Sequence, residues 1–297
     1  MIYCFPLFRQ MKKMSALIPS IISFISYVSK VVIRRHSVLH DVHKCIIPIP
    51  KIPHLTLGEK EIKGRTLFII GDVHGCFDEL NDLLDKVNKK LGGTDKYLPI
   101  FVGDLVNKGP KSIEALRKIR SIEHYAVRGN HDAAAYRERL MMFKHNDYNP
   151  PQRWQWVKQL DNDDIDYLKE IPYTISIPTY NAIIVHAGLV PNIPLQDQSI
   201  KDMIIMRNLV LDEDTKTLKS AELPNDGHPW ASLWPGPQKV YFGHDAKRKL
   251  QEYPFALGLD TGCLYGFLLT GVILNENGTE ELLQVQARNV YEKPVDG

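Results

Sequence analysis

The chain has 297 residues, of which 44% are apolar and 24% are charged, and its formal net charge at pH 7 is only +2. This composition is that of a soluble globular protein, and so small a net charge excludes a strong affinity for polyanions that rests on bulk charge alone. The four cysteines are widely scattered, which argues against a fold held together by disulfides.

The first 45 residues differ in composition from the rest of the chain. The stretch "MSALIPSIISFISYVS" (residues 14–29) has no charged side chain, and basic residues lie on both sides of it. Residues 1–45 are therefore expected to be a hydrophobic anchor or a targeting segment. An anchor through residues 14–33 has nearly the ~20 apolar residues that cross a bilayer, and it would attach the protein to an organelle membrane such as that of a vacuole. A basic, serine-rich mitochondrial transit peptide is the alternative, and a secretory signal is a third.

Residues 46–63 are expected to be an extended linker, because "IIPIPKIPHLTL" holds three prolines. Residues 64–290 are expected to form one folded domain, in which apolar runs alternate with helical patterns, as is typical of an α/β fold. Buried strands are predicted from short β-branched apolar runs at residues 66–70, 98–102, 124–127, 182–185 and 239–242. Helices are predicted between these strands, at residues 80–91, 112–119 and 133–142.

The later segments are less regular. Residues 144–170 are expected to be a helical insertion, in which Trp154 and Trp156 either pack or offer a surface for base stacking. The proline-rich residues 191–235 are expected to be an irregular cap over the strand ends. Near the C-terminus, the runs "FALGLD", "GFLLTGVIL" and "ELLQVQ" predict antiparallel strands that close a second sheet.

Each of the five predicted strands is followed by an aspartate, asparagine or histidine beside a glycine. The motifs are "GDVHG", "GD", "RGNHD", "HAG" and "GHD". Because sites in open α/β sheets form at the carboxyl ends of strands, these side chains are expected to converge. The candidate metal ligands are Asp72, His74, Asp104, Asn130, His186 and His244.

This donor set contains carboxylate, amide and imidazole groups but no thiolate, which suits divalent Mn, Fe, Zn or Co. Six ligands exceed the need of one catalytic ion, and they suit two ions with one carboxylate bridging them. Paired ions clamp the attacking and leaving oxygens of a phosphoryl transfer and acidify a water molecule. The pattern therefore predicts a dinuclear, metal-dependent phosphohydrolase.

The motifs together resemble the phosphoprotein-phosphatase branch of the metallophosphoesterases, over about residues 65–270. The resemblance implies a calcineurin-like sandwich of two mixed β-sheets flanked by helices. It also implies that the six residues are metal ligands, that Asp104 bridges the ions, and that His131 protonates the leaving oxygen. Arg128 belongs to the same motif and is expected behind the site, without an obvious contact to substrate.

Protein serine/threonine phosphatases have Asp-Arg where this chain has Asn107-Lys108. The stretch "GDLVNKGP" instead resembles the ApaH-like phosphatases, which are related to symmetrical diadenosine tetraphosphatases and to a vacuolar endopolyphosphatase. "MRN", "FGHDA" and "LDTGCLYG" resemble the same subgroup. This resemblance implies that Arg207 contacts substrate phosphate, and Asp260 is expected to support the ligands from behind.

The change at Asn107-Lys108 has a chemical interpretation. Asparagine can hydrogen-bond His131 but supplies no charge that would hold a proton on the imidazole. A phosphate leaving group, with a second pKa near 6, needs less protonation than an alkoxide does. Lys108 offers a point charge that can neutralise a polyphosphate without imposing one orientation. We therefore expect a phosphoanhydride substrate, either inorganic polyphosphate cleaved internally or a dinucleoside polyphosphate.

Alternatives from other classes remain at this point. A protein serine/threonine phosphatase that tolerates Asn107 and Lys108 is one, and a non-catalytic phosphate-binding protein is another. Hydrolysis of an RNA cap would also be an anhydride reaction, but the chain lacks a marked basic stripe, so no specific nucleic-acid binding is predicted.

Overall fold

The computed structural model describes residues 47–223 and 225–293. Its described part falls into two units: residues 47–140 together with those from 149 on, and the short stretch 141–148. The larger unit contains all the strands described below. The predicted segment 1–45, with its proposed anchor at residues 14–33, lies outside the described residues. Within residues 47–223 and 225–293, no helix has the length and apolar character needed to cross a bilayer.

One sheet has five strands in the order β14-β13-β2-β3-β4. The strands β2, β3 and β4 run parallel, and β13 pairs antiparallel with both β2 and β14. Two predicted antiparallel strands near the C-terminus are thereby confirmed. The bounds are β2 (Thr66–Ile70), β3 (Tyr97–Phe101), β4 (Tyr125–Ala126), β13 (Leu268–Leu274) and β14 (Glu280–Gln286).

The second sheet has six strands in the order β1-β5-β6-β10-β12-β11. In it β6, β10 and β12 run parallel, whereas β5 and β11 pair antiparallel with their neighbours β6 and β12. The bounds are β1 (His54–Thr56), β5 (Thr174–Ile177), β6 (Ala182–Val185), β10 (Lys239–Phe242), β11 (Gln251–Tyr253) and β12 (Ala256–Gly258).

The main core lies between the two sheets. Alternate residues of each strand contribute to it, such as Leu67 and Ile69 of β2 and Ile184 of β6. The residues between them are buried as well: Ile183 and Val185 pack on the opposite face of β6. Strands buried on both faces carry unbroken apolar runs, which explains why β2, β6 and β10 begin and end where the sequence predicts.

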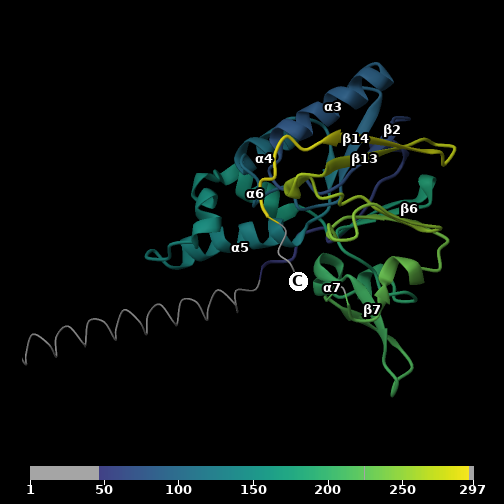
Figure 1. The fold of residues 1–297 in the computed structure, drawn as a ribbon. Coiled ribbons are helices and arrows are strands. Elements are labelled where there is room, and N and C mark those ends of the chain that lie inside the picture. Colours follow the sequence, from purple (N-terminus) through teal and green to yellow (C-terminus); the bar gives the residue numbers. More distant parts are fainter. Residues whose placement is uncertain (1–46, 224, 294–297) are drawn as a thin grey trace, which may run out of the picture. The chain divides into compact units, whose positions relative to one another are not determined.

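Helices cover the outer side of the five-stranded sheet. Figure 1 shows α3 (Phe77–Leu91) running along the sheet that carries β13 and β14, with α4 (Ser112–Arg120) beside it. α3 ends at Gly92, whose φ of 83° is the left-handed conformation that glycine adopts readily at helix ends. The remaining helices on this part of the chain are α5 (Asn130–Lys144), the 3₁₀ helix η1 (Gln152–Gln159) and α6 (Asn162–Glu170).

Residues 191–235 are more ordered than the predicted irregular cap. They contain α7 (Ile200–Ile205) and a three-stranded sheet in the order β8-β7-β9. Their apolar side chains, among them Met203, Met206 and Trp230, form a second core against the outer face of the six-stranded sheet. These elements are too short to show periodicity in the sequence. Their bounds are β7 (Asn208–Leu211), β8 (Leu218–Ala221), β9 (His228–Pro229), η3 (Leu195–Asp197) and η4 (Trp230–Leu233).

Two further segments differ from expectation. The three C-terminal runs do not form a sheet of their own: β12, in the run "FALGLD", joins the six-stranded sheet, parallel to β10 and antiparallel to β11, whereas β13 and β14 join the sheet of β2. Residues assigned to the linker 46–63 join the domain, because β1 pairs with β5 and is followed by α2 (Glu59–Ile62). Both cases depend on partners far along the chain, which a local pattern does not reveal. The sandwich of two mixed sheets flanked by helices is confirmed.

Candidate active site

The predicted site residues follow the carboxyl ends of strands in both sheets. Asp72 and His74 follow β2, Asp104 follows β3, and Asn130 and His131 begin α5 after β4. In the other sheet, His186 follows β6 and His244 follows β10. Because the strands within each group run parallel, their ends meet at one edge of the sandwich.

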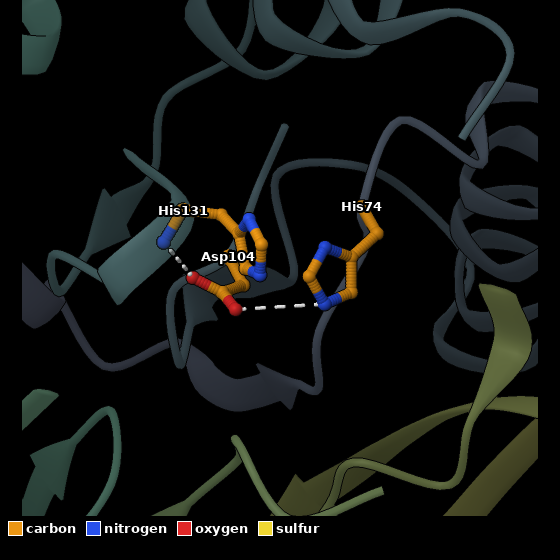
Figure 2. A group of neighbouring side chains, drawn as sticks. All are labelled: His74, Asp104 and His131. Carbon is orange, nitrogen blue, oxygen red and sulfur yellow. Dashed lines mark hydrogen bonds and ion pairs between the residues drawn. The ribbon is translucent and has the colours of Figure 1, made fainter. Parts of the chain in front are cut away.

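Asp104 lies at the centre of these residues, as Figure 2 shows for its contacts with His74 and His131. One carboxylate oxygen accepts the backbone N–H of His131 at 2.8 Å and lies 3.5 Å from His186 Nε2. The other oxygen lies 3.5 Å from His74 Nε2. Among the described residues, two groups able to hold a metal ion share this carboxylate: His74, Asp104 and His131, and Asp104, His186 and His244.

The imidazoles of His186 and His244 are turned as metal ligands would be. His186 Nδ1 donates to the carbonyl of Val102 at 2.9 Å, and His244 Nε2 donates to that of Ile205 at 3.1 Å. Their other ring nitrogens, which then carry lone pairs, both lie 3.1 Å from Asn130 Oδ1. Three acceptor atoms thus converge with no proton between them, so a cation fits here and the backbone carbonyls fix each tautomer.

Among the described residues, the ion-pair contacts of Asp72 and Asp104 are with histidines and not with lysine or arginine. Burial, then the neighbouring charges of Asp260 and Asp104, raise the pKa of Asp72 well above its ordinary value. Burial likewise raises the pKa of Asp104 and of Asp260 to about 7. Asp72 accepts the backbone N–H of His244, and its Oδ2 lies 4.0 Å from His74 Nε2. Divalent ions would supply the charge that this cluster lacks, so the residues present fit a pair of metal ions.

The backbone at these positions is in the left-handed region. The φ angles are 48° at His74, 51° at Asp104 and 71° at His244. Asn107 and Lys108 follow the same pattern, with φ of 78° and 69°. Non-glycine residues rarely adopt this conformation, and such strain concentrates at functional sites. Sequence patterns gave no sign of this strain.

Two motif glycines allow the backbone to approach the carboxylates. A Cβ at Gly129 would lie 2.1 Å from Asp104 Oδ1, and one at Gly243 would lie 1.9 Å from Asp72 Oδ1. Any side chain at either position would displace a ligand. The buried Asp132 holds the same loops together, since its carboxylate accepts the N–H groups of Leu105 and Gly129, both at 2.9 Å.

His131 and Asn107 are in contact, as the sequence predicts, and Trp156 determines how. The indole Nε1–H of Trp156, which can only donate, lies 3.1 Å from Asn107 Oδ1. The amide nitrogen of Asn107 therefore faces His131 and donates to its Nδ1 at 2.9 Å. It follows that the proton of the neutral imidazole is on Nε2. The sequence offered only packing or base stacking for Trp156, and no spacing connects it to Asn107.

His131 is uncharged in this environment. Burial, followed by the nearby charge of Lys108, lowers the pKa of His131 to about 2. The ring of Trp154 stacks on the imidazole with centroids 6.1 Å apart. His131 therefore presents one Nε2–H donor and no positive charge.

Lys108 and Arg207 line one cavity with four of the six candidate ligands, whereas the buried Asp72 and His186 are not part of its lining. Lys108 Nζ donates to the hydroxyl of Tyr265 at 3.2 Å, a contact the sequence did not reveal. Arg207 donates to the carbonyls of Glu222 and His244, at 3.2 and 3.4 Å. The cavity has a volume of about 720 Å³, which is within the usual range for small-molecule sites. It is lined by His74, Asp104, Lys108, Asn130, His131, Arg207, Leu223, His244, Asp245, Ala246, Lys247, Lys249, Asp260, Tyr265 and Phe267.

Arg128 is placed differently from Asp260. Asp260 lines the cavity, as expected of a residue that supports the site. The fully buried Arg128 instead donates to the carbonyls of Leu168 and Lys169 at the end of α6 and to the hydroxyl of Tyr173. Carbonyls at a helix end lack partners within the helix, so Arg128 stabilises this junction and not the ligands.

Comparison with known proteins agrees with this geometry. Residues 65–258 match the family model described as calcineurin-like phosphoesterase. The chain is 29% identical over 230 residues to an asymmetrical bis(5'-nucleosyl)-tetraphosphatase, PrpE, of Halalkalibacterium halodurans, with 69% of this chain and 88% of the relative covered. It is 26% identical over 262 residues to a symmetrical bis(5'-nucleosyl)-tetraphosphatase of Coxiella burnetii, with 71% and 89% covered.

A solved structure is also similar. The crystal structure of a candidate diadenosine tetraphosphatase superposes with a TM-score of 0.69 at 36% identity, and the match covers 80% of this chain and 99% of that one. The resemblance to ApaH-like phosphatases and tetraphosphatases that the motifs indicate is thereby confirmed.

The contact between Gly129 and Asp104 gives a direct test of the metal site. Gly129→Ala is expected to push the Asp104 carboxylate aside and to weaken Mn²⁺ binding on the order of 10–100-fold, measured by isothermal titration of metal-free protein. Gly58→Ala is the control, because Gly58 has a φ of −97° that alanine adopts readily, and a Cβ there meets only the end of the Glu61 side chain, at 3.3 Å. Equal Mn²⁺ affinity in the Gly129 and Gly58 variants would contradict the assignment.

Proposed function

The chain belongs to the calcineurin-like phosphoesterase family, and we propose that it hydrolyses phosphoanhydride bonds of dinucleoside polyphosphates. The observation that carries the proposal is the hydrogen bond that Asn107 donates to Nδ1 of His131, because an amide supplies no negative charge that would hold a proton on that nitrogen. The relatives described as tetraphosphatases support the same class of substrate.

Two divalent ions would be held by the candidate ligands. Asp72, His74 and Asp104 would hold one, and Asp104, Asn130, His186 and His244 would hold the other. When bound, such ions acidify a water molecule and neutralise charge on the transferring phosphoryl group. The carbonyls of Val102 and Ile205 keep the ring nitrogens of His186 and His244 deprotonated toward the site.

Lys108 and Arg207 would bind the non-reacting phosphates. Both line the cavity that is also lined by four of the candidate ligands. Lys108 is steadied by the Tyr265 hydroxyl, and a lysine ammonium is a compact charge that accepts several phosphate orientations. Arg207 is held by two carbonyls and lies with Nε 3.6 Å from Asp245 Oδ1, so its guanidinium is oriented before substrate arrives.

The leaving group decides between anhydride and ester. His131 offers a hydrogen bond from Nε2 but carries no positive charge. That is enough for a departing phosphate, whose second pKa is about 6, and poor for an alkoxide, whose basicity approaches the pKa of about 15.7 of water. The site therefore favours anhydrides over the phosphoserine or phosphothreonine esters of protein substrates.

Inorganic polyphosphate is a second candidate substrate. Four cations, Lys108, Arg207, Lys247 and Lys249, line the same cavity and could follow a long phosphate chain. It also contains only anhydride bonds, so the argument from His131 applies to it equally. The two classes differ in the nucleoside, and their relative turnover distinguishes them.

A double variant tests the leaving-group argument. With Mn²⁺ bound, the protein is expected to hydrolyse diadenosine tetraphosphate in preference to a phosphothreonine peptide. In the variant Asn107→Asp with Lys108→Arg, a carboxylate lies beside His131 and raises the pKa of the imidazole. The new guanidinium can donate two parallel hydrogen bonds to a terminal phosphate. The ratio of kcat/KM for tetraphosphate to that for peptide is then expected to fall at least about tenfold.

The matched control makes the same substitutions elsewhere. Asn192 and Lys216 are exposed, have positive φ like their counterparts and lie outside the cavity. Asn192→Asp with Lys216→Arg is expected to leave the ratio unchanged. An unchanged ratio in the site variant, or a wild type that prefers the peptide, would overturn the proposed function.

Trp156→Phe tests how the amide of Asn107 is oriented. Loss of the indole N–H removes one hydrogen bond, worth about 0.5–1.5 kcal/mol, and kcat for the tetraphosphate is expected to fall about three- to tenfold. Trp234→Phe is the control, since its indole N–H donates to Gln238 away from the cavity.

A second substitution separates orientation from packing. Aspartate has two equivalent oxygens, so in an Asn107→Asp background Trp156→Phe is expected to cost less. An equal cost in both backgrounds would show that Trp156 acts by packing alone.

A further inference from the structure

Part of the lining of the catalytic cavity, called the apolar wall below, consists of exposed apolar side chains. Phe267 and Leu223 line the cavity, and their side chains are 40% and 63% exposed. Tyr265 also lines the cavity and lies near Phe267, since a Cβ at Gly262 would lie 3.2 Å from the ring of Phe267 and 3.7 Å from that of Tyr265. The Tyr265 hydroxyl accepts a hydrogen bond from Lys108. The rest of the lining consists mostly of charged residues and imidazoles, so this wall has no evident part in binding phosphate or metal.

The backbone of Phe267 is held in place by hydrogen bonds. It lies between the 3₁₀ helix η5 (Cys263–Tyr265) and β13. Its N–H donates to the carbonyl of Gly262 at 3.1 Å, and its own carbonyl accepts the N–H of Ala287 at 2.8 Å. The side-chain amide of Gln286 donates to the same carbonyl at 3.0 Å. An exposed ring on a rigid backbone is a preformed flat surface.

A lysine already covers each aromatic ring of this wall. Lys249 Nζ lies 3.6 Å from the centroid of the Phe267 ring, and Lys108 Nζ lies 5.7 Å from that of Tyr265. The Phe267 ring therefore already accommodates a cation on one face, where a flat base would stack in its place. An aromatic face next to an ammonium suits a base together with the phosphate attached to its sugar.

We propose that Phe267 is a stacking platform for one nucleobase of the substrate. The base replaces the Lys249 ammonium on the ring, and that ammonium moves to a phosphate of the same nucleotide. This inference rests on the proposed function, and it names the part of the site that recognises the nucleoside. Stacking tolerates any base, because every base has a π-face, so the platform selects nucleotides over inorganic phosphate chains but not one base over another.

The test uses two non-hydrolysable ligands that differ only in the nucleoside. Adenosine α,β-methylene diphosphate and methylenediphosphonate are titrated into the Mn²⁺-loaded full-length protein by calorimetry. Phe267→Ala is expected to weaken the nucleotide on the order of tenfold or more and to leave the diphosphonate within about twofold. Phe267→Trp keeps an aromatic face and is expected to retain nucleotide affinity.

Phe255→Ala is the matched control, since Phe255 is 39% exposed and lies outside the cavity. It is expected to change neither affinity. Equal weakening of both ligands in Phe267→Ala, or no loss of nucleotide affinity, would overturn the platform. So would a wild type that binds the two ligands equally.

This result and the proposed function can fail separately. If nucleotide affinity depends on Phe267 but the protein does not hydrolyse diadenosine tetraphosphate, the stacking platform is supported and the proposed function is contradicted. If wild type and Phe267→Ala both hydrolyse diadenosine tetraphosphate with the same KM, the proposed function is supported and the stacking platform is contradicted.

Discussion

The site depends on one buried carboxylate, that of Asp104. It accepts the backbone N–H of His131 and lies 3.5 Å from both His74 and His186, so loops from both sheets meet at it. The carbonyl of Asp104 also accepts the N–H of His74 at 2.7 Å, which ties the loop after β3 to the loop after β2. A buried charge of this kind is stable only with cationic partners. The burial of the Asp104 carboxylate among these loops accounts for three features: the left-handed backbone around it, the glycine at residue 129 and the raised pKa of Asp104.

Around this centre, the residues divide the chemistry between them. Backbone carbonyls set the tautomers of His186 and His244, and Asn107, oriented by Trp156, sets that of His131. Each contact is an ordinary hydrogen bond, yet together they decide which ring atoms carry protons. Under the proposed function, Asn107, which stands where protein serine/threonine phosphatases have aspartate, would suit a leaving group of low basicity, and the lysines of the cavity would suit a chain of phosphates.

Much of this could be predicted from the sequence, and the reasons are local. A strand buried on both faces shows as an unbroken apolar run, and a ligand at its end shows as a polar residue beside glycine, as with β2 and Asp72. Contacts between distant segments leave no such trace. The parallel pairing of β12, the strand β1 within the expected linker, and the link from Trp156 to Asn107 each join residues whose separation carries no pattern. Arg128 shows the converse: it lies in the catalytic motif, but its side chain stabilises the end of α6.

The most direct test of the account is the number of metal ions that Asp104 holds. Metal analysis of protein reloaded with Mn²⁺ and passed through a desalting column is predicted to give two ions per chain. Asp104→Asn is predicted to lose tight binding of both, because both groups of ligands share this carboxylate. Asp163→Asn, whose side chain is 83% exposed, is predicted to keep two. One ion per wild-type chain, or two ions retained by Asp104→Asn, would contradict a centre built on a shared carboxylate.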